Sequence, residues 1–173
     1  MTSMKKNKDL SACAASELPD GSPYSIAIAV ADWNAEVTHA MLEGATETLL
    51  KSGVKEENII TVHVPGSFEL TSAAGMLLNY TSADAVICIG CVIQGETRHF
   101  EFIIHAVAGG IAQLCASQCR PVIFSVLTTN TPEQAKERAG GKCGNKGVEG
   151  AVTALRMCHL NDQLSSCKSK KSR

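Results

Sequence analysis

Residues 85–100 read AVICIGCVIQGETRHF and combine a strand, a glycine-bounded loop and the start of a helix. The apolar run 85–93 is typical of a strand that is covered on both faces. Gly95 lies in the polar loop, and the residues beyond it predict a helix over about 98–117. His99 would lie at the start of that helix, beside backbone N–H groups that can bind an anion. This segment alone also allows the plainer interpretation that His99 is an ordinary polar residue of a first helical turn.

The alternation of strand and helix continues on both sides of this segment. Residues 25–31, 58–64 and 121–127 predict three more strands, and residues 34–52, 68–80, 131–140 and 148–164 predict further helices. Strands separated by helices imply parallel pairing with right-handed crossovers. The sequence therefore predicts one three-layer αβα domain of the α/β class with a four-stranded parallel sheet. Ligands bind such sheets beyond the carboxyl ends of the strands, which here are the loops 32–34, 65–69, 94–99 and 128–130.

Local signals predict where several of these helices begin and end. Asn34 and Ser67 are expected N-caps, because their side chains can accept a hydrogen bond from the first helical turn. Thr131 followed by Pro132 is a strong helix start. Gly53 fits a C-terminal stop. The spacing of four residues along the first helix marks its inner face as Val37, Met41, Ala45 and Leu49.

Length, composition and charge exclude several classes of protein. The chain has 173 residues, 45% of them hydrophobic and 19% charged, with a net charge of −1, which is an ordinary composition for one globular domain. We expect neither a general nucleic-acid surface nor a membrane surface, and no apolar run as long as a transmembrane helix. The expected domain spans residues 23–164, between a flexible N-terminal segment, 1–22, and a basic flexible tail, 165–173.

The eight cysteines predict reduced thiols in a cytoplasmic protein. Several of them lie in apolar runs, where a thiol behaves as a small hydrophobic group. No cluster of cysteine and histidine has the spacing of zinc ligands, so we expect no metal site. The segment 10–13, LSAC, resembles a lipoprotein cleavage box, but residues 1–9 are polar and offer no apolar segment for membrane insertion, so we expect neither lipidation nor export.

Candidate functional side chains fall in the predicted strand-end loops, and each has a structural alternative. Trp33 and Phe68 can stack on a flat heterocycle or can cap the core. Glu69 can accept hydrogen bonds from ligand hydroxyls or serve as an acid of the first helical turn. Thr97 can bind an oxyanion or cap a helix. Arg138 and Lys146 flank a glycine-rich turn suited to phosphate, although each taken alone is expected to be solvated surface charge. Four other histidines are expected to be structural or at the surface: His39, His63, His105 and His159.

Taken together, several motifs resemble the 6,7-dimethyl-8-ribityllumazine synthase family. They are residues 64–69 (VPGSFE) with 73–75 (AAG), residues 89–101 (IGCVIQGETRHFE), and residues 137–142 (ERAGGK) with 144–147 (GNKG). The resemblance covers about residues 25–160 and implies a flavodoxin-like topology. It also allows an added N-terminal strand that would pair with a neighbouring subunit. It implies the penultimate step of riboflavin biosynthesis, in which 5-amino-6-(D-ribitylamino)uracil and 3,4-dihydroxy-2-butanone 4-phosphate condense without a metal or an organic cofactor.

The resemblance also implies a role for each site residue. His99 would move protons. Trp33, with Phe124 of a neighbouring subunit, would stack on the pyrimidine, and Glu96 and Thr97, with the neighbour's Arg138, would bind the butanone phosphate. The remaining pyrimidine and ribityl contacts would come from Ser67, Phe68, Glu69, Cys91, Val92 and Ile93, with Lys146 and Glu149 as additional candidates.

Four positions depart from the usual pattern of the family. Trp33 stands where Phe is frequent and Phe68 where Trp is frequent, so each position keeps an aromatic ring. Glu96 brings a negative side chain to a phosphate loop and would have to act through its backbone N–H. Cys143 stands where some members have His, and we assign it no role.

The resemblance further implies a homo-oligomer. The helix after His99 contains six alanines and glycines, which are Ala106, Ala108, Gly109, Gly110, Ala112 and Ala116. Glycine within a helix lowers its stability unless close helix packing offsets the loss. A pentamer is the expected active unit, and a closed 60-subunit shell is favoured because the segment 139–147 is short. Pro19 and Pro23 argue against the strand pairing that a shell requires. Riboflavin synthase is a candidate partner. The alternative function is an inactive shell or flavin-binding protein of the same fold.

Overall fold

The computed structural model describes residues 18–170 and contains one four-stranded sheet in its central layer. Its strands are β1 (Ile26–Ala31), β2 (Ile59–Val64), β3 (Ala85–Ile93) and β4 (Val122–Thr129). The order across the sheet is β2-β1-β3-β4, and every pair is parallel. This is the strand order of a flavodoxin-like sheet, with its switch point between β1 and β3. The predicted fold class and sheet are therefore confirmed.

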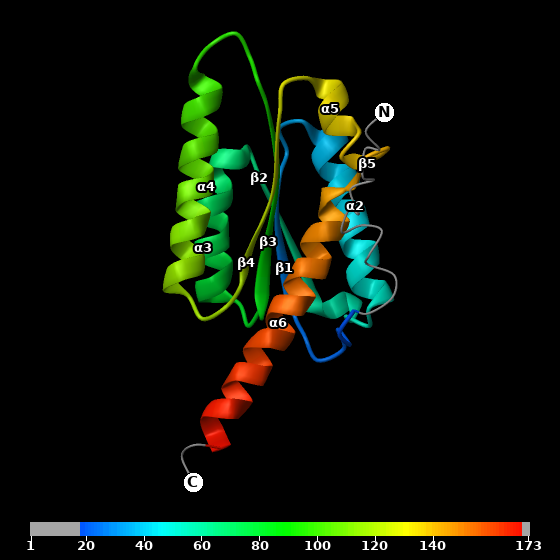
Figure 1. The fold of residues 1–173 in the computed structure, drawn as a ribbon, viewed down its shortest axis with the longest axis vertical. Coiled ribbons are helices and arrows are strands. Elements are labelled where there is room, and N and C mark those ends of the chain that lie inside the picture. Colours follow the sequence, from blue (N-terminus) through cyan, green and yellow to red (C-terminus); the bar gives the residue numbers. More distant parts are fainter. Residues whose placement is uncertain (1–17, 171–173) are drawn as a thin grey trace, which may run out of the picture.

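Two pairs of helices cover the two faces of the sheet (Figure 1). Helices α2 (Ala35–Lys51) and α6 (Lys146–Lys170) lie on one face, and α3 (Leu70–Tyr80) and α4 (His99–Ser117) lie on the other. All six residues of β1 are buried because the strand is covered on both sides. Its isoleucines and Val30 pack toward α2 and α6, whereas Ala27 and Ala29 pack toward α3. These small residues allow α3 to lie close to the sheet.

The first helix follows its sequence signals closely at one end and departs from them at the other. Gly53 adopts φ 94°, and the N–H groups of Gly53 and Val54 donate to the carbonyls of Leu50 and Leu49. This is a Schellman ending, as the sequence predicted. Asn34 does precede α2, but its side chain makes no capping hydrogen bond. It adopts the left-handed conformation instead, and its amide donates to the carbonyl of Cys91 at 2.9 Å.

Two further capping predictions have different outcomes. Thr131 caps the helix α5 (Pro132–Lys136) as predicted, because its hydroxyl accepts from the N–H of Gln134 at 3.3 Å. Ser67 does not cap α3. It begins a short 3₁₀ turn, η2 (Ser67–Glu69), and the residue before α3 is Glu69.

The segment after α5 differs from the prediction of a helix that reaches residue 140. Helix α5 ends at Lys136, and a hairpin of β5 (Ala139–Gly141) and β6 (Gly144–Asn145) follows. Gly140 and Gly144 have φ values of 119° and 78°, which a helix cannot contain. Asn145 then accepts from the N–H of Gly147, so α6 begins at Lys146 rather than at residue 148.

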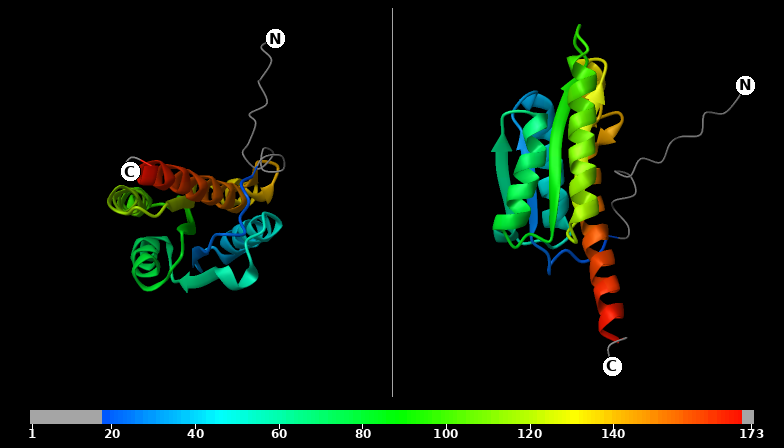
Figure 2. Two further views of the ribbon diagram at one scale, coloured as in Figure 1. Left: turned by 90° about the horizontal axis from the view of Figure 1, so that it is seen from below. Right: turned by 90° about the vertical axis from the view of Figure 1, so that its left-hand side faces the viewer.

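Helix α6 also ends later than predicted. It continues to Lys170, so residues 165–170 are helical instead of belonging to a flexible tail. Its last turns extend beyond the three layers, as Figure 2 shows. Residues 1–17 and 171–173 lie outside the described part, and with them Cys13 and most of the N-terminal segment. Residues 18–25 contain no strand, so an added N-terminal strand would have to lie in the part that is not described.

Helix α4 is apolar and yet largely uncovered. An 18-residue stretch of this 19-residue helix has a mean hydropathy of 1.4 and is 11% buried, so the expectation that no apolar run approaches transmembrane length is wrong. One helix that qualifies by length and composition is weak evidence for a membrane. Val107 and Ile111 are its buried residues, and they pack onto the sheet. The other side of α4, including Phe102, is exposed to solvent in the single chain.

Candidate active site

A cavity of about 370 Å³ opens at the carboxyl ends of β1 and β3, where ligands bind in sheets of this kind. Its walls come from the loops after β1, β2 and β3 and from the first turns of α4. The residues that line it are Trp33, Asn34, Gly66, Ser67, Phe68, Glu69, Cys91, Val92, Ile93, Gly95, Thr97, His99, Phe100 and Ile103. Nine of the predicted site residues thus lie around one space.

Two aromatic side chains form exposed walls of the cavity. Trp33 is 73% exposed and Phe68 is 57% exposed, so neither is a core cap, which was the structural alternative for both. The backbone beneath Trp33 is fixed, because the N–H groups of Asp32 and Trp33 donate to the carbonyls of Val64 and Pro65. An exposed ring on a fixed backbone is available to stack on a flat ligand.

Close packing beneath the cavity accounts for Gly90, one of the two glycines in residues 85–100. A Cβ atom on Gly90 would lie 2.7 Å from the Ser67 hydroxyl oxygen, so a larger residue would force the Ser67 or Leu70 side chain to move. The Ser67 hydroxyl is buried, and it has no hydrogen-bond partner within the described chain. Buried hydroxyls are nearly always bonded in proteins, and exceptions often mark functional sites.

His99 and Thr97 lie where the loop after β3 enters α4. Thr97 does not cap the helix in the usual position, because Arg98 precedes its first residue. The Thr97 hydroxyl does accept from the N–H of His99 at a long 3.4 Å. Both side chains line the cavity at the N-terminal end of α4, where the helix dipole favours a bound anion. An imidazole, a hydroxyl and an anion-binding helix end therefore share one wall.

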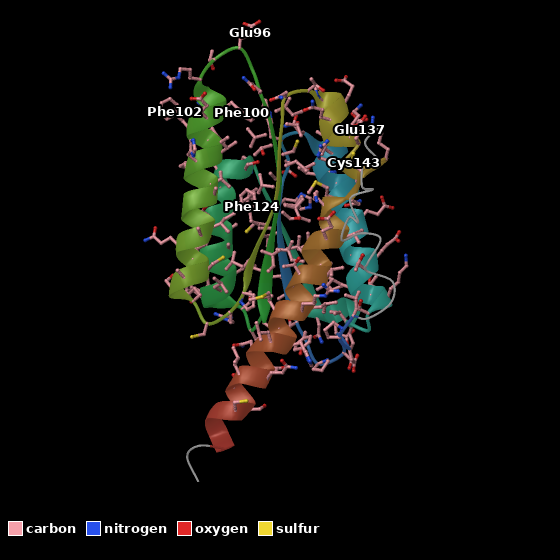
Figure 3. The ribbon with its side chains drawn as sticks, viewed as in Figure 1. Glu96, Phe100, Phe102, Phe124, Glu137 and Cys143 are labelled. Atoms are coloured by element: carbon pink, nitrogen blue, oxygen red, sulfur yellow. The ribbon has the colours of Figure 1, made fainter. Side chains whose placement is uncertain are left out.

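Glu96 lies apart from the other loop residues. Figure 3 shows it at the crest of the loop between β3 and α4, where it is exposed, and it does not line the cavity. The base of the same loop is held by a hydrogen bond from the N–H of Gln94 to the carbonyl of Thr129. A carboxylate at the crest can point away from a bound anion.

The remaining predicted residues line a second cavity of about 470 Å³ beside β4, the edge strand. These residues are Phe124, Arg138, Lys146 and Glu149. Phe124 is 44% exposed, and the Arg138 guanidinium donates to the carbonyl of Gln134 at 3.0 Å. Lys146 and Glu149 form an ion pair, and Glu149 is buried. Within one chain, the residues predicted for one site are therefore divided between two cavities.

Comparison with known proteins agrees with the motifs and the fold. The 6,7-dimethyl-8-ribityllumazine synthase family matches residues 23–162. The chain belongs to this family. Proteins named 6,7-dimethyl-8-ribityllumazine synthase from Cytophaga hutchinsonii and Porphyromonas gingivalis are 55% and 54% identical to it, over 82% and 83% of this chain and 89% of each relative. A protein of that name from Thermus thermophilus is 46% identical over 81% of this chain and 89% of its own length.

The cavity of this family member includes residues to which sequence reasoning gave no ligand role. Asn34 was expected only as a cap, and Phe100 and Ile103 were not singled out. The spacing of three residues between Phe100 and Ile103 places them on one face of α4, which is a signal that the sequence does contain.

One cysteine pair also escaped the sequence reasoning. Cys88 and Cys91 have C-x-x-C spacing, which on a loop or helix end suggests redox or metal chemistry. Both lie in β3, and they pack into the two cores on opposite faces of the sheet. Burial raises the pKa of Cys88 to about 12 and that of Cys91 to about 11. Neither thiol can serve as a ready thiolate near neutral pH.

Proposed function

We propose that this chain is a 6,7-dimethyl-8-ribityllumazine synthase of riboflavin biosynthesis. The enzyme condenses 5-amino-6-(D-ribitylamino)uracil with 3,4-dihydroxy-2-butanone 4-phosphate to give 6,7-dimethyl-8-ribityllumazine, and it releases inorganic phosphate and water. The observation that carries the proposal is the 370 Å³ cavity, in a chain of this family, with two exposed aromatic rings, a histidine and a helix N-terminus in its walls. These groups match a flat ring, a series of proton transfers and a phosphate leaving group.

The pyrimidine ring stacks on Trp33 in this proposal. Trp33 offers a large exposed face, and Phe68 closes the cavity from the loop after β2. Glu69 accepts hydrogen bonds from the ribityl hydroxyls, since it lines the cavity together with Ser67. The β3 residues Cys91, Val92 and Ile93 provide the floor.

His99 is the proposed proton-transfer group. The 5-amine of the pyrimidine attacks the ketone of the butanone phosphate, and one water is lost on imine formation. Phosphate is then eliminated, and the resulting enol tautomerises to a ketone. The ribitylamino nitrogen attacks that ketone, and loss of a second water closes the ring. Each of these steps moves a proton, and an imidazole can accept or donate one near neutral pH. The exposed position of His99 on the cavity wall gives it access to a bound substrate.

The phosphate binds between the start of α4 and Arg138 of a neighbouring subunit. Thr97 and the backbone N–H groups around Glu96 supply donors on one side. Arg138 supplies a planar cation that can form paired hydrogen bonds to phosphate. In the single chain Arg138 lines the other cavity, so a complete phosphate site requires two copies.

The proposed unit is therefore a homopentamer with sites between neighbours. Phe124 borders the second cavity and also a hollow against the exposed side of α4, lined by Ala108, Ala112 and Ala116. Contact with a second copy would cover this apolar surface and would bring Phe124 and Arg138 to the first cavity of the neighbour. Lys146 and Glu149 would approach the same place. We further propose assembly of twelve pentamers into a 60-subunit shell in the cytoplasm, with riboflavin synthase as a candidate partner.

Product formation tests the function directly. Purified protein mixed with both substrates should produce the absorbance of the lumazine, and omission of either substrate should abolish it. Arg138→Lys should raise the KM for the butanone phosphate far more than the KM for the ribitylaminouracil, because Lys keeps the charge but loses the paired geometry. Equal effects on both constants would assign Arg138 a structural role. Absence of turnover in a folded, assembled protein would favour the inactive shell or flavin-binding protein.

A further inference from the structure

Three side chains outside the cavity converge beside it: Asp32, His39 and His63. One ligand atom from each lies within 4.8 Å of the other two. The Asp32 carboxylate oxygen Oδ1 is 2.7 Å from Nδ1 of His63 and 3.6 Å from Nε2 of His39. The two imidazole rings meet edge to face with their centres 5.6 Å apart. None of the three lines the substrate cavity, although Trp33, the next residue after Asp32, does.

The three residues come from different elements whose backbones are locked together. Asp32 follows β1, His63 is the penultimate residue of β2, and His39 lies in the second turn of α2. The strand register pairs Val30 with His63, and the N–H of Asp32 donates to the carbonyl of Val64 at 2.8 Å. Hydrogen-bonded backbone therefore holds Asp32 next to His63, and the third donor, His39, is held by α2.

The chemistry of the donor set fits a divalent transition-metal ion. Two imidazole nitrogens and one carboxylate oxygen suit Zn²⁺, Co²⁺, Ni²⁺ or Cu²⁺, whereas Mg²⁺ and Ca²⁺ prefer oxygen ligands. The hydrogen bond from His63 holds the pKa of the Asp32 carboxyl below its usual value, so Asp32 is a carboxylate at neutral pH. Side-chain exposures of 53%, 50% and 48% for Asp32, His39 and His63 leave the remaining coordination positions open to water.

Two of the three ligand separations are already near those of a bound ion, and the third, between His39 and His63, lies within 4.8 Å. Bonds of about 2.0–2.2 Å to zinc place neighbouring ligand atoms of a tetrahedral site roughly 3.3 Å apart. The 3.6 Å separation of Asp32 from His39 is already close to that value. The 2.7 Å contact with His63 is a hydrogen bond, which an incoming ion would replace by taking the lone pair of Nδ1 while the ring proton moves to Nε2 or to solvent.

We propose that Asp32, His39 and His63 bind one divalent transition-metal ion of the Zn²⁺ class at the edge of the active-site cavity. The ion is distinct from the reacting groups. It ties the end of β1 to β2 and α2 and so fixes the loop that carries Trp33. The sequence predicted no metal site, because ligands at positions 32, 39 and 63 have no recognisable spacing.

Cobalt is the probe that tests the proposal, because its visible spectrum reports the ligand type. The full chain, stripped with a chelator, is titrated with Co²⁺ under reducing conditions. We expect one Co²⁺ per chain with a nitrogen–oxygen spectrum and displacement by Zn²⁺. Asp32→Asn, His39→Gln and His63→Gln should each weaken binding by at least about tenfold. His159→Gln, a surface histidine bonded to Gln163 on α6, is the matched control and should bind like the wild type.

A second readout does not depend on cobalt. Cu²⁺ quenches a nearby indole, so it should reduce Trp33 emission in the wild type and in His159→Gln but not in His63→Gln. Circular dichroism checks that each variant is folded. Equal Co²⁺ affinity in the folded cluster variants and the wild type would overturn the proposal. A thiolate-to-cobalt charge-transfer band on the single tight site would overturn it as well, since that band would assign the ion to cysteines.

Discussion

At the scale of single residues, His99 carries the sharpest expectation. It is the first residue of α4 and lies on the cavity wall, and its backbone N–H is within reach of the Thr97 hydroxyl. His99→Ala should slow turnover by about 10- to 10⁴-fold, the usual contribution of a positioned acid–base group, while pyrimidine binding changes little. Steady-state kinetics and a separate binding measurement test this. Wild-type turnover in a folded His99→Ala protein would remove His99 from the mechanism.

Trp33 should report ligand binding directly. It is the sole tryptophan of the sequence and is 73% exposed, so its emission comes from one known environment. A pyrimidine or lumazine that stacks on the ring should quench this emission, and Trp33→Ala should weaken binding by roughly 1 kcal/mol or more. Trp33→Phe keeps an aromatic face and serves as the control that should retain most of the affinity. Emission unchanged at saturating product would contradict stacking.

The cysteines should differ in reactivity according to burial. Cys88 and Cys91 have pKa values raised to about 12 and about 11 by burial, whereas Cys119 and Cys167 are exposed. A raised pKa keeps the thiol protonated, so at pH 8 the two buried thiols should resist an alkylating reagent, and their thiolates should form only as the pH approaches 11. Mass spectrometry after timed alkylation measures this order. Early labelling of Cys88 would show that β3 is accessible.

At the scale of elements, the crossing of α2 and α6 depends on one glycine. A Cβ atom on Gly147 would overlap the carbonyl oxygen of Met41, and Asn145 ties the two helices through a 3.0 Å hydrogen bond to the carbonyl of Ala40. Gly147→Ala must therefore move one helix, and we expect a loss of about 1–3 kcal/mol or more in the free energy of unfolding.

Gly75 provides the matched comparison for that substitution. It lies inside α3, and a Cβ there meets nothing within 4 Å. Gly75→Ala should therefore stabilise the chain by about 1 kcal/mol through helix propensity. Urea unfolding of both variants separates the two effects. A neutral Gly147→Ala would mean that α6 can shift without cost.

At the scale of the whole molecule, the predicted site residues line two separate cavities of one chain, and the proposed shared site would form only on assembly. Five chains of 18.2 kDa would give about 91 kDa and sixty about 1.1 MDa, which sedimentation velocity distinguishes. Coexpression of His99→Ala with Arg138→Ala should restore activity in roughly a quarter of the shared sites, because a random pentamer pairs an intact His99 with an intact neighbouring Arg138. A fully active monomer, or the absence of any restoration in mixed assemblies, would contradict shared sites.

Much of the fold was predictable because its signals are local. The strands of residues 25–31 and 85–93, the inner face of α2, the Gly53 ending and the Thr131 cap all rest on residues within one or two turns of each other. The hairpin of β5 and β6 was missed because the choice between a continuing helix and a turn depends on positive φ angles at Gly140 and Gly144. Next to Gly144, the Asn145 amide donates to the carbonyl of Ala40 on α2, a contact between residues that are remote in the sequence.

The sequence by itself determined the order of the four sheet strands and of the helices that cover the sheet and, through several motifs in the right order, the family. Periodicity, caps and motifs are properties of neighbouring residues, so they can be recognised in the sequence without knowledge of the fold. The tertiary structure alone decided that Phe124 and Arg138 lie in a different cavity from His99, that one side of α4 is uncovered, and that Asp32, His39 and His63 meet. Each of these three features depends on strand register and on which sheet face a helix covers. Register and helix placement bring together residues that are remote in the sequence, and they are set only when the layers pack.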